Sequence, residues 1–191
     1  MPRILDIAQF GVAMPNRSRW EEFSHEVLGF QTVRSVDGRL TYVRWDGYHH
    51  RLALADATEN ATRYIAFDVG SREELEQWAD ALTAKKIAVR PVAPAECRAR
   101  HVQESIEFQD PDGHPIALGY GFEIAQEPVR YTRPLSVLRT GHLLLTVRDP
   151  KRACDFYTDV LGFRLSDWVQ LSDQVRIAFV RVNERHHTLA L

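Results

Sequence analysis

The sequence has only two cysteines, Cys97 and Cys154, and neither belongs to a C-x-x-C pair. Two cysteines cannot build the disulfide framework of a small secreted domain, so both are expected to be reduced. Long apolar runs are also absent. The N-terminus shows no signal-peptide core, and no stretch reaches the roughly 20 apolar residues of a membrane-spanning helix. We therefore expect a soluble, cytoplasmic protein without a membrane partner.

An excess of positive charge is missing as well. The 24 Lys and Arg residues are balanced by 26 Asp and Glu, which gives a net charge of −2, and no basic run occurs. Such a chain has no electrostatic footprint for nucleic acid. Its 191 residues, 45% of them hydrophobic, suffice for one large or two small domains with a sizeable core.

The apolar pattern predicts alternating helices and short strands. Trp20, Phe23, Val27 and Leu28 recur at helical spacing, which predicts a helix over 18–28 with Trp20 in the core. A capping box over 71–74 begins a second helix, in which Trp78 is a core position. Turn pairs and alternating residues predict strands at 4–14, 31–35, 40–45, 51–55, 63–69, 87–92, 105–109 and 115–120.

The sequence repeats itself. The motif Phe-x-x-x-Val-Leu-Gly-Phe at residues 23–30 returns at residues 156–163, an offset of 133 (156 − 23). The motif His-His-x-Leu-Ala-Leu at residues 49–54 returns at residues 186–191, an offset of 137 (186 − 49). Two motifs that recur in the same order indicate an internal repeat.

The repeat divides the chain into three units of the strand–helix–strands kind. Residues 1–122 are predicted to form an N-terminal α+β domain of two units, 123–137 a linker, and 138–191 the first unit of a second domain. A single unit of this kind cannot bury its sheet face alone. We therefore expect either that these residues are a fragment or that the third unit pairs with another chain, as in a homo-oligomer.

The third unit carries the residues of greatest chemical interest. Residues 139–147 are predicted to form a strand that takes His142 into an apolar interior, and a helix is predicted over 149–162. Alternate residues of a strand share a face, so Leu144 lies on the side of His142. A histidine in such a place is either a metal ligand or a hydrogen-bonded core residue.

Three motifs carry a family resemblance. They are Gly141-His142 at the start of a strand, Asn183-x-Arg185-His186-His187-x-Leu189-Ala190 near the end of the chain, and the Asp-Pro-Asp-Gly turn at 110–113. With the repeated helix motif, they make the chain resemble the vicinal oxygen chelate (glyoxalase/bleomycin resistance/dioxygenase) superfamily of paired βαβββ units. Within it, the chain looks most like the type I extradiol dioxygenases of the 2,3-dihydroxybiphenyl 1,2-dioxygenase group.

The resemblance implies a site for iron(II), held by two histidines and a glutamate. His142 matches the first metal histidine, and His187 matches the acid/base histidine. The second metal histidine and the glutamate belong to a fourth unit that this sequence lacks. Leu144 and Ala190 would line the substrate pocket.

The remaining histidines and the first domain receive no metal role at this stage. Gln9, Tyr64 and Gly119 occupy the corresponding ligand positions, so that domain is expected to be metal-free. His49, His50 and His186 are interpreted as structural or surface residues, and His25 as solvated. The loop residues His101 and His114 are given no role.

The leading hypothesis is an oxidoreductase that inserts O₂ into a small aromatic diol of the catechol type. One alternative is a lyase or isomerase of the same superfamily that uses manganese, zinc or nickel in place of iron(II). The other is a non-enzymatic small-molecule-binding protein, which the incomplete ligand set favours.

Overall fold

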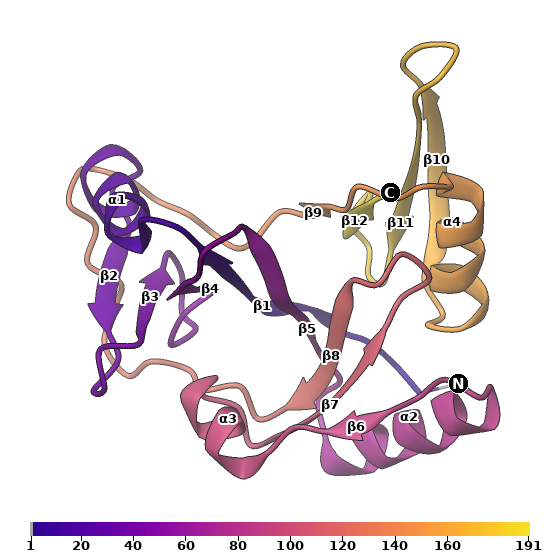
Figure 1. The fold of residues 1–191 in the computed structure, drawn as a ribbon, viewed down its shortest axis with the longest axis horizontal. Helices are drawn as coiled ribbons and strands as arrows, with labels where there is room; N and C mark the ends of the chain where they lie inside the picture. Colours follow the sequence, from indigo (N-terminus) through magenta and orange to yellow (C-terminus); the bar gives the residue numbers. More distant parts are fainter. Residues whose placement is uncertain (1) are drawn as a thin grey trace.

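The computed structural model describes residues 2–191 and contains two β-sheets (Figure 1). An eight-stranded sheet has the strand order β2-β3-β4-β1-β5-β8-β7-β6, and a four-stranded sheet has the order β10-β11-β12-β9. Over the described range, none of the helices combines the length and the apolar character needed to cross a bilayer.

Two units share the larger sheet. The first consists of β1 (Asp6–Met14), α1 (Arg17–Glu22), a π-helical turn η1 (Phe23–Val27), β2 (Gln31–Arg34), β3 (Leu40–Arg44) and β4 (Leu52–Asp56). The second consists of β5 (Ala61–Asp68), α2 (Arg72–Ala84), β6 (Arg90–Pro91), α3 (Pro94–Ala99), β7 (Glu104–Gln109) and β8 (Pro115–Tyr120). In each unit the first and last strands pair in parallel, β1 with β4 and β5 with β8.

The third unit repeats this plan. It consists of β9 (Leu143–Leu144), α4 (Pro150–Asp159), β10 (Arg164–Gln170), β11 (Arg176–Arg181) and β12 (Leu189–Ala190). Its first and last strands, β9 and β12, again pair in parallel. The predicted α+β fold of paired βαβββ units, with a third unit beside them, is confirmed.

One hydrophobic core joins the third unit to the second. The Phe67 ring of β5 packs edge-on against Phe163 at 5.6 Å between centroids. Tyr157 of α4 is fully buried, and its hydroxyl donates to Asp110 Oδ2 at 3.0 Å. Residues 123–137 contain no helix or strand, and Tyr131 within them donates a hydrogen bond to the carbonyl of Trp45 at 2.7 Å. The predicted linker therefore lies against the first unit.

The helix predicted over 18–28 is present as α1 and η1, but it is more exposed than expected. It continues beyond α1 only as the π-helical turn η1. Trp78 is fully buried as predicted, and Ser71 Oγ caps α2 by accepting from the Glu74 amide at 3.3 Å. Trp20, however, exposes 48% of its surface, so its core assignment is wrong: no other part of the described chain covers that face of α1.

Two strand predictions are also corrected. The strand expected over 87–92 is reduced to the two residues of β6, since an edge strand that contains a proline lacks one ladder donor. The helix α3, which has Pro94 in its first turn, was not predicted from the sequence. The strand expected over 139–147 is only β9, because β12, its partner in the sheet, is itself two residues long.

Candidate metal and acid–base site

The parallel pairing of β9 with β12 brings the two predicted site histidines together. Leu143 pairs with Leu189, so the residues that precede both strands meet at one edge of the small sheet. His142 directly precedes β9, and His187 lies two residues before β12. Their ring centroids are 4.3 Å apart, with an angle of 51° between the ring planes. Two residues 45 positions apart (187 − 142) therefore form one cluster.

Arg185 holds the turn that carries His187 against the start of β9. Its Nη1 donates to the carbonyls of Thr140 at 2.8 Å and Gly141 at 2.6 Å, and its Nη2 pairs with Asp6 of β1. A guanidinium can make these bonds at once because its donors form a planar fork. Arg185 is thus a positioning residue for the cluster; the sequence showed it only as part of a motif.

The two ring nitrogens of His187 have different surroundings. Its Nδ1 lies 2.9 Å from His186 Nδ1, and its Nε2 is a buried atom without a hydrogen-bond partner among residues 2–191. Partial burial, followed by the charges of His142, His186 and Arg185, lowers the pKa of His187 below its ordinary value. If His187 Nδ1 donates to His186, Nε2 keeps its lone pair and can accept a proton.

The surroundings of His142 differ from the prediction. His142 is exposed rather than inside an apolar interior, because β9 is the edge strand of a small sheet. Leu144 exposes 63% of its surface, so it too lies outside an apolar interior. Ala190 is buried. A role of Leu144 and Ala190 in a substrate pocket stays a prediction.

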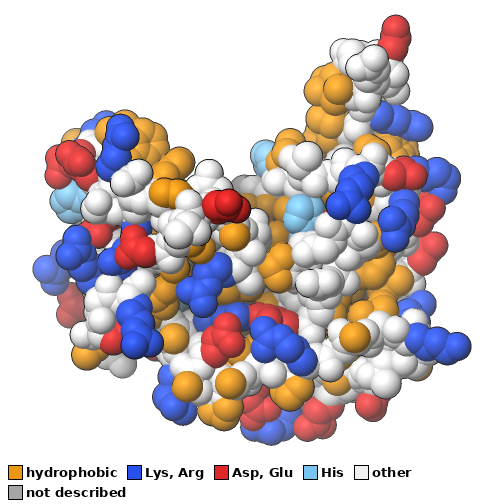
Figure 2. Space-filling view, in the orientation of Figure 1, with side chains coloured by type: hydrophobic (Ala, Val, Ile, Leu, Met, Phe, Trp, Pro, Cys, Tyr) orange, Lys and Arg blue, Asp and Glu red, His pale blue; other side chains and the backbone are white. Residues whose placement is uncertain are grey.

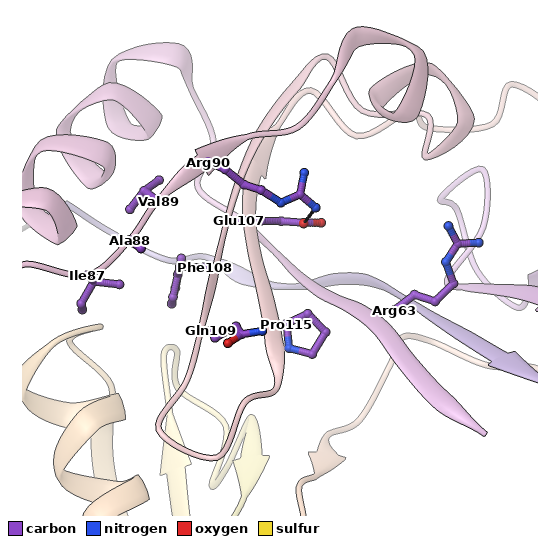
Figure 3. A pocket seen from close by; sticks show the side chains of 9 residues that line it. All are labelled: Arg63, Ile87, Ala88, Val89, Arg90, Glu107, Phe108, Gln109 and Pro115. Carbon is purple, nitrogen blue, oxygen red and sulfur yellow. Dashed lines mark hydrogen bonds and ion pairs between the residues drawn. The ribbon is translucent and has the colours of Figure 1, made fainter. Parts of the chain in front are cut away.

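The surface is hollowed in more than one place. Figure 2 shows a hollow between the first unit and the projecting β10–β11 hairpin, with histidine side chains near it. A cavity of about 440 Å³ opens beside β6, β7 and β8 (Figure 3), where the buried Glu107 carboxylate pairs with Arg90. Neither His142 nor His187 lines this cavity.

The ligand set for a metal at His142 is incomplete within the described chain. Only one set of three histidine, cysteine or carboxylate groups in residues 2–191 has ligand atoms within 4.8 Å of one another, and it consists of His49, His101 and Glu123. None of these belongs to the third unit. His142 could serve as one metal ligand, with the His187 imidazole beside it, and leaves the remaining ligands to be supplied.

The first-domain positions that correspond to metal ligands are otherwise engaged. Gln9, which matches His142 in the repeat, is buried, and its Nε2 donates to the carbonyl of Arg100 at 2.7 Å. The Tyr64 ring is buried beneath the guanidinium of Arg100, at 3.9 Å from its centroid. Gln9 and Tyr64 are therefore engaged in contacts with Arg100. His101 and Glu123, by contrast, were missed as potential ligands, because nothing in the sequence places their two loops together.

Comparison with known proteins identifies the family of the chain. The family model of the Glyoxalase/Bleomycin resistance protein/Dioxygenase superfamily matches residues 6–118 and 139–191. The biphenyl-2,3-diol 1,2-dioxygenase of Metapseudomonas furukawaii is 31% identical over 198 residues, which cover 98% of this chain and 65% of that protein. An iron-dependent extradiol dioxygenase of Rhodococcus jostii (strain RHA1) is 26% identical over 201 residues, 98% of this chain and 67% of that protein.

A solved structure gives the same result. The crystal structure of BphC, a halotolerant catechol dioxygenase, superimposes with a TM-score of 0.92 at 27% identity, over 100% of this chain and 65% of that one. The chain belongs to the Glyoxalase/Bleomycin resistance protein/Dioxygenase superfamily. Its similar proteins include extradiol dioxygenases that act on aromatic diols. The chain spans just under two thirds of the length of the first of these relatives.

Proposed function

We propose that this chain forms part of an extradiol dioxygenase that cleaves a small aromatic diol of the catechol type with O₂ at an iron(II) site. The observation that carries the proposal is the pairing of His142 with His187, whose Nε2 is buried and unpartnered. The names of the similar proteins, biphenyl-2,3-diol 1,2-dioxygenase and iron-dependent extradiol dioxygenase, support the substrate class and the metal.

Each residue of the cluster has a distinct role in this proposal. His142 is a metal ligand, through a neutral imidazole of the kind that divalent first-row metals bind. Iron(II), when bound, supplies a centre at which both diol oxygens and O₂ can meet. His187 accepts the proton of a substrate hydroxyl at Nε2, which its lowered pKa permits near neutral pH. Arg185 fixes the distance between the two histidines.

The second domain is completed in this proposal by a fourth βαβββ unit, which contributes the second metal histidine and the glutamate. Comparing the repeated helices supports this arrangement. Phe156 and Val160 of the third unit pack against the core that includes Phe108. Their counterparts 133 residues earlier, Phe23 and Val27, expose 40% and 52% of their surfaces. This helix face is therefore covered in the third unit and exposed in the first. The exposed face of the first unit is where a fourth unit could pack.

The proposal is tested by anaerobic titration of the protein with iron(II), followed by addition of 2,3-dihydroxybiphenyl and air. We expect oxygen uptake and a yellow ring-fission product in proportion to bound iron. His142→Ala should abolish iron binding at this site. His187→Ala should lower turnover by about 10²–10⁴-fold and leave iron affinity unchanged, because a proton-transfer residue is lost.

A matched control is His25→Ala, since His25 lies on the first unit beside Glu26 and outside the cluster. Full turnover by the His187→Ala protein would remove the role assigned to His187. Diol binding without iron uptake or product would instead support the binding-protein alternative. That alternative is favoured because the described residues supply no set of three metal ligands that includes His142. Light scattering on the same samples measures the oligomeric state. It tests whether a second copy of the chain packs against the third unit in place of a fourth unit.

A further inference from the structure

A second group of possible metal ligands lies in the first domain, away from the small sheet. His49 lies in the turn between β3 and β4, His101 follows α3, and Glu123 follows β8. One ligand atom from each lies within 4.8 Å of the others. The imidazoles of His49 and His101 stack with centroids 3.4 Å apart and an interplanar angle of 12°. His101 Nδ1 is 2.6 Å from Glu123 Oε2.

The backbone holds these three residues in place. The Glu123 amide donates to the His101 carbonyl at 2.9 Å, and the His49 amide donates to the Glu123 carbonyl at 2.8 Å. His101 also adopts a left-handed backbone conformation with φ of 51°, which few residues other than glycine adopt. Strained conformations persist where the surrounding structure fixes them, often at binding sites. The backbones of the three residues are therefore held together by bonds that do not involve their side chains.

A buried second layer supports the group. His50 is 2% exposed, and its Nδ1 lies 3.0 Å from His49 Nδ1, which leaves His49 Nε2 as the nitrogen free for a ligand bond. Metal-ligating histidines usually engage their other nitrogen in such a contact, which fixes the tautomer. In the same pocket, His50 Nε2 and Gln9 Oε1 are buried without partners in the described chain.

Two imidazoles and one carboxylate form a donor set suited to zinc, iron, cobalt or nickel, with coordination positions left open. The side chain of Glu123 is 53% exposed, so an ion can reach the group from solvent. His101 and Glu123 also line a cavity of about 470 Å³ that could admit water or a small ligand.

We propose that His49, His101 and Glu123 form a divalent transition-metal site in the first domain, separate from the His142 cluster. This site is not the one that the repeat would predict, because Gln9, Tyr64 and Gly119 take no part as ligands. It also replaces the expectation of a metal-free first domain. The proposal does not rest on the dioxygenase function. The competing description is an ion pair between protonated His101 and Glu123, which has no affinity for a metal.

Zinc(II) titration of the untagged protein by calorimetry separates the two descriptions. The titration is done in a His142→Ala background, so that the other cluster does not contribute. We expect about one zinc(II) per chain, and Glu123→Gln, which keeps the size of the side chain, should weaken binding at least tenfold. His101→Ala should do the same. Cobalt(II) should give a d–d absorption spectrum that both variants lose.

His25→Ala is the matched control, because His25 also lies beside a glutamate, 3.7 Å from Glu26, but has no third ligand. Its zinc affinity should equal that of the background protein. Absence of zinc binding in the background protein, or equal binding by the Glu123→Gln and His101→Ala variants, would overturn the proposal. If His101→Ala does not fold, the Glu123→Gln result decides alone.

Discussion

The bond between Tyr157 and Asp110 fixes the third unit, with its two site histidines, to the first domain. Both residues are buried, and the Tyr157 hydroxyl is the hydrogen-bond donor to Asp110 Oδ2. Oδ1 of the same carboxylate accepts from the amides of Asp112 and His114 instead. Tyr157→Phe deletes this donor, leaves the ring in place and creates almost no cavity. Since a hydrogen bond to a charged group contributes about 1.5–3 kcal/mol, we expect the free energy of unfolding to fall by about 2 kcal/mol.

Tyr42→Phe is the matched control for this measurement. Tyr42 is also buried, but its hydroxyl donates to the neutral carbonyl of Ala99 at 2.7 Å, within the first domain. A neutral bond contributes about 0.5–1.5 kcal/mol, so this variant should lose roughly half as much stability. Urea unfolding followed by fluorescence and circular dichroism gives both values. A loss for Tyr157→Phe no larger than that for Tyr42→Phe would refute the reasoning.

Three further predictions concern ionisable side chains that are buried or that bridge two parts of the fold. Burial, with the charges of neighbouring residues, holds the pKa of His50 well below the ordinary 6.5, so the unfolded chain binds that proton more readily. The free energy of unfolding should therefore decrease as pH falls below about 6.5. In urea titrations at several pH values, His50→Gln should make the free energy of unfolding depend less on pH. An unchanged dependence on pH would contradict this prediction. Arg185→Met should speed hydrogen exchange at the Leu143 amide, and equal exchange rates would exclude its positioning role. Asp46→Asn strips the buried Arg51 of its carboxylate and should cost about 3–5 kcal/mol in thermal unfolding, with a loss below about 1 kcal/mol counting against it.

Much of the fold was predictable because short stretches of sequence determine it. Apolar spacing, turn residues and the capping serine gave α2, α4 and nearly every strand of the large sheet. The repeat then gave the βαβββ plan without any knowledge of contacts. Trp20 could not be placed this way. Helical spacing shows which residues share a face of α1, but what covers that face is decided by parts that pack from elsewhere in sequence.

The two candidate sites differ in the same way: one could be predicted from sequence motifs, and the other depends on contacts between distant loops. His142 and His187 were singled out together because both match motifs of the family that the sequence resembles, and their rings lie side by side in the structure. His101 and Glu123 belong to loops of the second unit and of the following segment. They meet His49 only through backbone bonds between those loops, and sequence reasoning has no access to such contacts.

The two histidine pairs show how one repeated element can support different chemistry. His49-His50 and His186-His187 have the same local geometry, with Nδ1 atoms 3.0 and 2.9 Å apart. Their neighbours differ. In the third unit, the residue before the first strand is His142, which meets the second histidine of its pair. In the first unit, the matching residue is Gln9, which is bonded to the Arg100 carbonyl, and the first histidine of the pair stacks on His101 instead. The pair is therefore a common local structure that the two proposals use differently, as a base in the third unit and as a metal ligand in the first.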